Sequence, residues 1–172
     1  HIGETAVQTQ AILEKAKGGI LFIDEAYTLN KGKSSQHNFG LEAINTILKY
    51  MEDYRNEIMI IFAGYTKEME QFFETNPGLK SRVPNTFFFE DYSGDEIVEM
   101  GLKNLQKSAY QLEDATYYAM RVKQAYSRSL DHSNGRWIRN FNEHLMRALA
   151  NRVVETQVDD YVTIINDDID DV

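Results

Sequence analysis

Two adjacent carboxylates, Asp24 and Glu25, directly follow a run of four apolar residues, Ile20 to Ile23. Such a run is typical of a strand covered on both faces of a parallel sheet, and these sheets carry their chemistry at the carboxyl ends of the strands. There, one carboxylate can hold a magnesium ion through water while its neighbour takes a proton from an attacking water. The pattern predicts Asp24 as metal partner and Glu25 as general base of a phosphoryl-transfer site; two solvated acids at a strand end are the alternative.

A phosphate-binding loop of the form G-x-x-x-x-G-K-[ST] is absent from the sequence. Gly32, Lys33 and Ser34 resemble the end of such a loop, but Tyr27 stands where its first glycine is required. We therefore interpret these residues as part of a solvated loop. The predicted site then contains the residues for magnesium and for the attacking water, but not the loop that binds the phosphates of a nucleotide.

Arg82 ends the polar segment Asn76 to Arg82, which we expect to form a turn at the edge of the first domain. Its planar guanidinium matches the charge that grows on a transferring γ-phosphate, and a neighbouring subunit can supply such an arginine. The alternative is a surface arginine paired with a nearby acid.

Arg136 lies in the first turn of a predicted helix that begins at Gly135, and Arg139 follows in the next turn. A cation is unfavourable there because the amino-terminal end of a helix carries a partial positive charge. This local conflict indicates a function, such as reaching a phosphate, since departures from local rules concentrate at functional sites. The alternative is an ion pair with Glu113 or Asp114.

The elements that must position these residues alternate between strands and helices in the first half of the chain. Apolar runs predict strands at Ile20–Ile23, Ile58–Ala63 and Thr86–Phe89. Amphipathic spacing predicts helices over about residues 4–17, 39–54 and 67–74. This alternation is typical of an α/β domain with a parallel sheet.

From Ser93 onward the pattern contains helices alone, so we place a domain boundary near Tyr92. Ser93 and Glu96 have the spacing of a capping box for a helix that runs to about residue 108, and further helices are predicted over about residues 113–130 and 135–155. Residues 161–165 are interpreted as a short strand or a frayed end before an acidic tail. The expected organisation is an α/β part over 1–92, an all-helical unit over 93–155 and a strand or tail over 156–172.

Composition narrows the classes of function. The formal net charge of −9 is concentrated at the end of the chain, where residues 155–172 hold seven acids and neither lysine nor arginine. Without a basic surplus, nucleic-acid binding is not expected. The longest apolar run, Ile58 to Ala63, is too short to cross a bilayer, so membrane insertion is not expected. The absence of cysteine makes a cytoplasmic location the expectation.

Six segments together resemble one family in its order and spacing: GGILFIDEAYTL, FGLEAINTILKYMEDYRN, IIFAGYTKEM, NPGLKSRV, FEDYSGDEI and NGRWIRN. They are similar to the AAA+ ATPases of the subfamily that holds stage V sporulation protein K, the red-type (CbbX-like) Rubisco activases and the type VII secretion ATPases. The resemblance runs from about Gly3 to Val154 and is strongest to the sporulation branch. It implies part of an AAA+ P-loop NTPase core, a parallel sheet with helices, followed by a small helical lid.

The resemblance implies roles for the candidate residues at a site for ATP and Mg²⁺. Asp24 and Glu25 correspond to the Walker B pair, with Asp24 holding the metal through water. Arg82 corresponds to the arginine finger that completes a neighbour's site, and Arg136 to sensor two over the phosphates of its own subunit. Tyr65 takes the sensor-one position, where many AAA+ proteins have asparagine.

The resemblance also implies partners. The ATPases that this sequence resembles work as hexameric rings that pull on a client protein. Ile2 and Gly3 correspond to the end of the pore loop that grips the client, and His1 stands where the family has an aromatic residue.

In the family's sheet, the phosphate loop and the central strand come from a segment that these residues do not contain. We therefore expect a fragment, or part of a polypeptide whose first segment is elsewhere, that hydrolyses ATP in the complete protein and binds ATP weakly alone. Without the central strand, the third predicted strand has no neighbour, and each unpaired buried amide would cost about 1–3 kcal/mol. The alternative function is a non-catalytic interaction module derived from an AAA+ protein.

Overall fold

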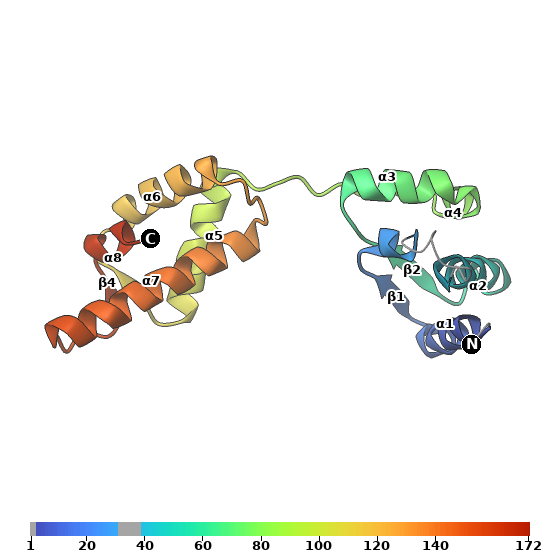
Figure 1. Ribbon diagram of the computed structural model, residues 1–172, viewed down its shortest axis with the longest axis horizontal. Helices are drawn as coiled ribbons and strands as arrows, with labels where there is room; N and C mark the ends of the chain where they lie inside the picture. Colours follow the sequence, from blue (N-terminus) through green and yellow to red (C-terminus); the bar gives the residue numbers. More distant parts are fainter. Residues whose placement is uncertain (1–2, 31–38) are drawn as a thin grey trace. The chain divides into compact units, whose positions relative to one another are not determined.

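The computed structural model describes residues 3–30 and 39–172 of the chain. The chain divides into two compact units, with the division between Phe88 and Phe89. Figure 1 shows a first unit with strands and helices and a second unit made mainly of helices. Among the described residues, no helix is both long and apolar enough to span a membrane.

The first unit is built on two strands, β1 (Ile20–Ile23) and β2 (Met59–Phe62). They pair in parallel, with Ile20 opposite Met59 and Ile23 opposite Phe62. The chain between them forms η1 (Ala26–Asn30), a 3-10 helix, and α2 (Phe39–Asp53). Parallel strands joined through a helix confirm the prediction of an α/β core.

Only one face of this sheet is covered by the described part of the chain. Leu21 and Ile60 pack against α1 (Glu4–Ala16) and α2. On the opposite face, Ile20 is 62% exposed and Met59 is 58% exposed. The expectation that β1 is covered on both faces is therefore wrong for these residues, because the described helices of the first unit gather on one side of the sheet.

The third predicted strand, Thr86–Phe89, is not formed. It pairs with neither strand of the first unit, and Phe87, Phe88 and Phe89 are 81%, 71% and 96% exposed. The backbone N–H and C=O groups of a strand require a neighbouring strand. An apolar run alone therefore does not produce one, and the unpaired segment agrees with the expectation that it has no neighbour among these residues.

The predicted turn at residues 76–82 is instead a short helix, α4 (Pro77–Arg82), which follows α3 (Thr66–Thr75). Proline suits the first turn because its missing N–H would have no helical partner there. Asn76 joins the two helices: its Nδ2 donates to the carbonyl oxygen of Phe72 at 2.7 Å, and its own carbonyl accepts the N–H of Leu79 at 2.9 Å. Arg82 is therefore the last residue of a helix.

The second unit packs three long helices around one core: α5 (Gly94–Lys107), α6 (Ala115–Arg128) and α7 (Gly135–Thr156). The predicted capping box is confirmed, because Ser93 Oγ accepts the N–H of Glu96 at 3.3 Å and Glu96 Oε2 accepts the N–H of Ser93 at 2.8 Å. The hydrogen bond from the Ser93 backbone, with a second from its hydroxyl, holds the pKa of Glu96 below its usual value.

A buried tyrosine connects the three helices. Tyr118 Oη donates to Asn142 Oδ1 at 2.8 Å, and Asn142 Nδ2 donates to the carbonyl oxygen of Gly101 at 2.9 Å. A Cβ atom at Gly101 would lie 2.1 Å from the Tyr118 hydroxyl, so only glycine allows this close approach. Burial raises the pKa of Tyr118, which keeps its proton for this hydrogen bond.

The unit predicted as all-helical over 93–155 contains a short strand, which corrects the prediction, whereas the short strand considered for residues 161–165 is formed. β3 (Gln111–Leu112) pairs in parallel with β4 (Thr163–Ile164), and α8 (Asn166–Asp170) follows β4. Ile164 and Ile169 are buried in the core of this unit. The residues expected as an acidic tail are therefore largely folded onto the helices.

Two arginines form ion pairs with two of the three acids of α8. Arg152 Nε donates to Asp168 Oδ1 at 2.8 Å, and Arg152 Nη2 donates to the carbonyl oxygen of Thr163 at 2.9 Å. Asp168 is only 1% exposed. Its hydrogen bond raises the pKa of Arg152. Arg121 forms a second ion pair, with Asp170. The acidic composition suggested that these residues are solvated. Arg121 of α6 and Arg152 of α7 instead make it favourable for α8 to pack against the helices.

We expect Asp168→Ala to lower the free energy of unfolding of the second unit by about 3–5 kcal/mol, because Arg152 loses its partner in a mostly buried place. Trp137, the single tryptophan, lies in α7, so its fluorescence during urea unfolding reports on this unit. As a matched control, Asp167→Ala removes an exposed carboxylate of the same helix and should change stability by no more than about 0.5 kcal/mol. Coincident unfolding curves for Asp168→Ala and the unmodified chain would contradict this role.

Candidate functional site

The end of β1 forms a tight turn that carries the two carboxylates. Glu25 has a φ of 47°, a conformation that residues with a side chain rarely adopt. Asp24 Oδ1 accepts the N–H of Glu25 at 2.9 Å, and the carbonyl of Glu25 accepts the N–H of Thr28 at 2.8 Å. The N–H of Ala26 donates to the carbonyl of Ala63 at 3.0 Å, which ties the turn to the end of β2. Both acidic residues are exposed.

Tyr27, which sequence reasoning did not assign to the site, lies between the ends of β1 and β2. A Cβ atom at Gly64 would lie 2.8 Å from Tyr27 Cδ1 and from Met69 Sδ, so the ring occupies space that only glycine leaves. The pKa of the Tyr27 hydroxyl is raised, mainly because the hydroxyl is partly removed from water and secondly because the Glu25 carboxylate is near. A glycine directly after an apolar strand is the sequence signal that could have indicated this close packing.

Tyr65 follows β2 directly before α3 and is 66% exposed. Its ring centroid lies 6.4 Å from that of Tyr27. Because β1 and β2 are parallel, their carboxyl ends share one edge of the sheet. The structure therefore brings Tyr65 to the same edge as Asp24 and Glu25.

The two carboxylates fit a magnesium ion that is bound mainly through water. Oxygen atoms are the ligands that Mg²⁺ prefers, and it usually takes one or two carboxylates, several waters and substrate phosphates. Among the described residues, no group of three or more histidine, aspartate or glutamate side chains could enclose a metal. Asp24 Oδ1 accepts one hydrogen bond, from the Glu25 amide, so the Asp24 carboxylate keeps acceptor positions that could hold a metal-bound water.

Arg82 is not brought together with Asp24 and Glu25. Arg82 Nε donates to Glu52 Oε2 of α2 at 3.2 Å, and Nη1 donates to the carbonyl of Gly78 at 3.2 Å. The surface pair that was the alternative interpretation is therefore formed in this chain. Such an exposed pair contributes only about 0–1 kcal/mol, so a phosphate can compete for the guanidinium.

Arg136 lies in the first turn of α7 and is exposed. Neither acid considered as its partner binds it. Asp114 Oδ1 caps α6 by accepting the N–H groups of Thr116 and Tyr117 at 2.8 and 3.0 Å, and Glu113 Oε2 accepts the first N–H of α8 at 3.5 Å. Within the described ranges, Arg136 has no ion-pair partner.

Some predicted residues lie outside the described ranges. Ile2 lies outside them, and so does the loop that contains Gly32, Lys33 and Ser34. Gly3 is described: it has a φ of 90°, which suits glycine, and directly precedes α1. The pore-loop role of Ile2 and Gly3 stays a prediction.

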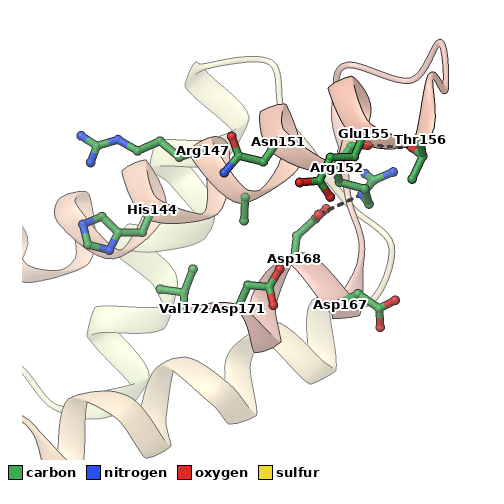
Figure 2. A pocket seen from close by; sticks show the side chains of 11 residues that line it. His144, Arg147, Asn151, Arg152, Glu155, Thr156, Asp167, Asp168, Asp171 and Val172 are labelled. Carbon is green, nitrogen blue, oxygen red and sulfur yellow. Dashed lines mark hydrogen bonds and ion pairs between the residues drawn. The ribbon is translucent and has the colours of Figure 1, made fainter.

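A groove of about 530 Å³ in the second unit is lined by residues of α7 and α8. Figure 2 shows His144 and Arg147 of α7 along this groove, with Asp171 beyond the end of α8 and the Arg152–Asp168 ion pair joining the two helices. Both signs of charge line the groove. None of the predicted site residues does.

The sequence matches a known family of proteins. Residues 1–91 match the family described as "ATPase family associated with various cellular activities (AAA)", and residues 93–172 match the AAA lid domain. The chain therefore belongs to the AAA family. The prediction of a partial α/β core followed by a lid is confirmed at this level.

Individual relatives confirm the subfamily. The chain is 43% identical over 159 residues to stage V sporulation protein K of Bacillus subtilis (strain 168). The aligned region covers 90% of this chain and 48% of that protein. It is 38% identical over 154 residues to protein CbbX of Cereibacter sphaeroides, covering 89% of this chain and 50% of that protein. It is also 38% identical over 157 residues to the chloroplastic ribulose bisphosphate carboxylase/oxygenase activase of Cyanidioschyzon merolae (strain NIES-3377 / 10D), covering 91% and 53%. The chain thus spans about half the length of these relatives.

Proposed function

We propose that this chain is part of an ATP-hydrolysing AAA+ motor that remodels a client protein as a hexameric ring. The observation that carries the proposal is the exposed Asp24–Glu25 turn at the end of β1, within a chain that matches the AAA family and its lid. Since the sequence has no phosphate loop, we assign the phosphate side of the site to a segment outside these residues.

Glu25 and Asp24 divide the work at the hydrolytic site. Bound ATP supplies the γ-phosphoryl group, and Mg²⁺ neutralises charge on its oxygens. Glu25 orients the attacking water and accepts its proton. Asp24 keeps the Glu25 backbone in its turn through Oδ1, and its carboxylate would hold the metal through water. Tyr65 stands at the same sheet edge, where a sensor-one residue helps to position the water.

Two arginines complete the site from different places. Arg82 of one subunit leaves its weak pair with Glu52 and reaches the γ-phosphate bound by the next subunit. Arg136 binds the phosphates held by its own subunit, which is consistent with its exposure and its lack of an ion-pair partner in the described part of the chain.

The partners of the complete protein follow from the same proposal. Copies of the protein form the ring, and Ile2 and Gly3 end the loop that contacts a client polypeptide. The balance of charge before the acidic end favours a protein client over a nucleic acid. The absence of cysteine supports a cytoplasmic location.

A second candidate is a non-catalytic interaction module that takes a place in another ring. The observation that favours it is the lack of a phosphate loop in these residues, together with the exposed sheet face around Ile20 and Met59. This candidate predicts that changes at Glu25 leave ATP turnover unaltered, which separates it from the motor.

Residues 1–172 alone are expected to show no micromolar affinity for ATP, because the groups that cradle the phosphates are lacking. Isothermal titration calorimetry with ATP and Mg²⁺ measures this affinity. The control is a longer polypeptide that includes an upstream phosphate loop, which we expect to bind and hydrolyse ATP. Micromolar binding by residues 1–172 alone would contradict the proposed division of the site.

A further inference from the structure

Asn134 joins three segments of the second unit through its side chain. Its Oδ1 accepts the N–H of Tyr92 at 2.9 Å and the hydroxyl of Tyr126 at 3.0 Å. Its Nδ2 donates to Asp91 Oδ1 at 2.8 Å and to the carbonyl oxygen of His132 at 2.9 Å. A carboxamide offers two N–H donors and two oxygen lone pairs, so every hydrogen-bonding position of this side chain is used.

The backbone of Asn134 has an unusual conformation, with φ 55° and ψ −113°. A residue with a side chain adopts such angles only where the surrounding contacts enforce them. Aromatic rings hold the neighbourhood in place, because Tyr126 is buried and its ring centroid lies 4.9 Å from that of Trp137. The strain is therefore balanced by the four side-chain hydrogen bonds and this packing.

Asn134 connects the segment that enters the second unit with the first turn of α7, which carries the candidate site residue Arg136. Asp91 and Tyr92 belong to the stretch by which the chain enters the second unit, directly before the cap of α5. On the other side, the carbonyl of Asn134 accepts the N–H of Ile138 at 3.1 Å and so begins the hydrogen bonding of α7. Arg136 lies between these two residues, in the first turn of α7. Asn134 thus connects the entering segment to the turn that carries Arg136.

We propose that Asn134 is a positioning residue for Arg136: its side chain fastens the first turn of α7 to Asp91 and Tyr92, and so sets where Arg136 stands relative to the segment by which the chain enters the second unit. This inference rests on the sensor-two role proposed for Arg136. Removing the side chain frees the first turn of α7, whereas the core residues further along the helix keep their packing.

The test uses the complete polypeptide and a non-hydrolysable ATP analogue. Asn134→Gly removes the four hydrogen bonds and accommodates the positive φ, so that backbone strain does not confuse the result. We expect the dissociation constant of the analogue to rise roughly tenfold, within the range measured for coupled neighbours. Combined with Arg136→Ala, the change adds nothing to the effect of Arg136→Ala alone. As a control, Asn140→Ala alters an exposed asparagine of the same helix and leaves the affinity unchanged.

A rescue experiment separates positioning from a general role in folding. Asn134→Asp places a second carboxylate beside Asp91 and weakens analogue binding, whereas adding Asp91→Asn restores a donor and acceptor pair and recovers most of the affinity. Circular dichroism shows whether the helices remain. Additive effects of Asn134→Gly and Arg136→Ala, or a failed rescue, would overturn the inference.

The two levels of the proposal fail in different ways. If Arg136→Ala weakens binding and Asn134→Gly does not, only the positioning role is overturned. If Arg136→Ala leaves binding unchanged, the sensor-two role itself is wrong, and the inference is overturned with it.

Discussion

In the complete polypeptide, we expect Glu25→Gln to lower ATP turnover by about 10²–10⁴-fold while ATP still binds. The amide retains the size of the side chain at the end of β1 but cannot accept the proton of the attacking water. Asp24 and the turn that it stabilises should remain, so we expect the proposed metal-binding group to be retained. Steady-state hydrolysis measures turnover, and calorimetry with ATP and Mg²⁺ measures binding.

The matched control is Glu70→Gln, because Glu70 is an exposed glutamate of α3 in the same unit. We expect its turnover to equal that of the unmodified protein. Unchanged turnover in Glu25→Gln would remove Glu25 from the mechanism and favour the non-catalytic module. Loss of binding together with turnover would show that Glu25 acts on the structure of the turn rather than as a base.

Arg82→Ala is expected to reduce ATP hydrolysis by on the order of 10³–10⁵-fold, the range for loss of an arginine finger. The charge that grows on the γ-phosphoryl oxygens then lacks the guanidinium that stabilises it. The fold should persist, because the Arg82–Glu52 pair is exposed and pairs of this kind contribute little. Lys80→Ala, which removes an exposed cation of the same helix, is the control and should leave hydrolysis unchanged.

Mixed assemblies test whether Arg82 acts on a neighbouring subunit. Subunits with Arg82→Ala retain Glu25, and subunits with Glu25→Gln retain Arg82. In a mixed ring, an interface between the two kinds can contain both intact residues, so hydrolysis recovers above that of either variant alone. If mixing restores no activity across a range of ratios, the assignment of Arg82 to a neighbour's site is wrong.

Local chemistry in the sequence predicted several elements of the fold. The apolar runs at Ile20–Ile23 and Ile58–Ala63 correspond to β1 and β2, whose pairing is parallel as expected. Ser93 and Glu96 predicted the start of α5 because a capping box is complete within four consecutive residues. The capping box depends on neighbours in the sequence, which is why a pattern was sufficient for it, whereas β1 and β2 form because each has the other as a partner.

The elements that were predicted wrongly depend on distant partners. Thr86–Phe89 has the composition of a strand, but the described chain offers it no strand to pair with. The acidic residues of α8 resemble a solvated tail, yet Arg152 and Arg121 make their packing favourable. Composition alone contains no information about these partners.

For the candidate site, the sequence by itself supplied the candidate groups: adjacent carboxylates after a strand, one arginine on a predicted turn and another in the first turn of a predicted helix, and membership of the subfamily through six ordered segments. The tertiary structure decided how these groups are held. Tyr27 packs over Gly64 beside Glu25, and Asn134 connects Asp91 to the turn before Arg136. The physical reason is that residue type sets which bonds a side chain can form, whereas only folding brings together the residues, far apart in the chain, that form them.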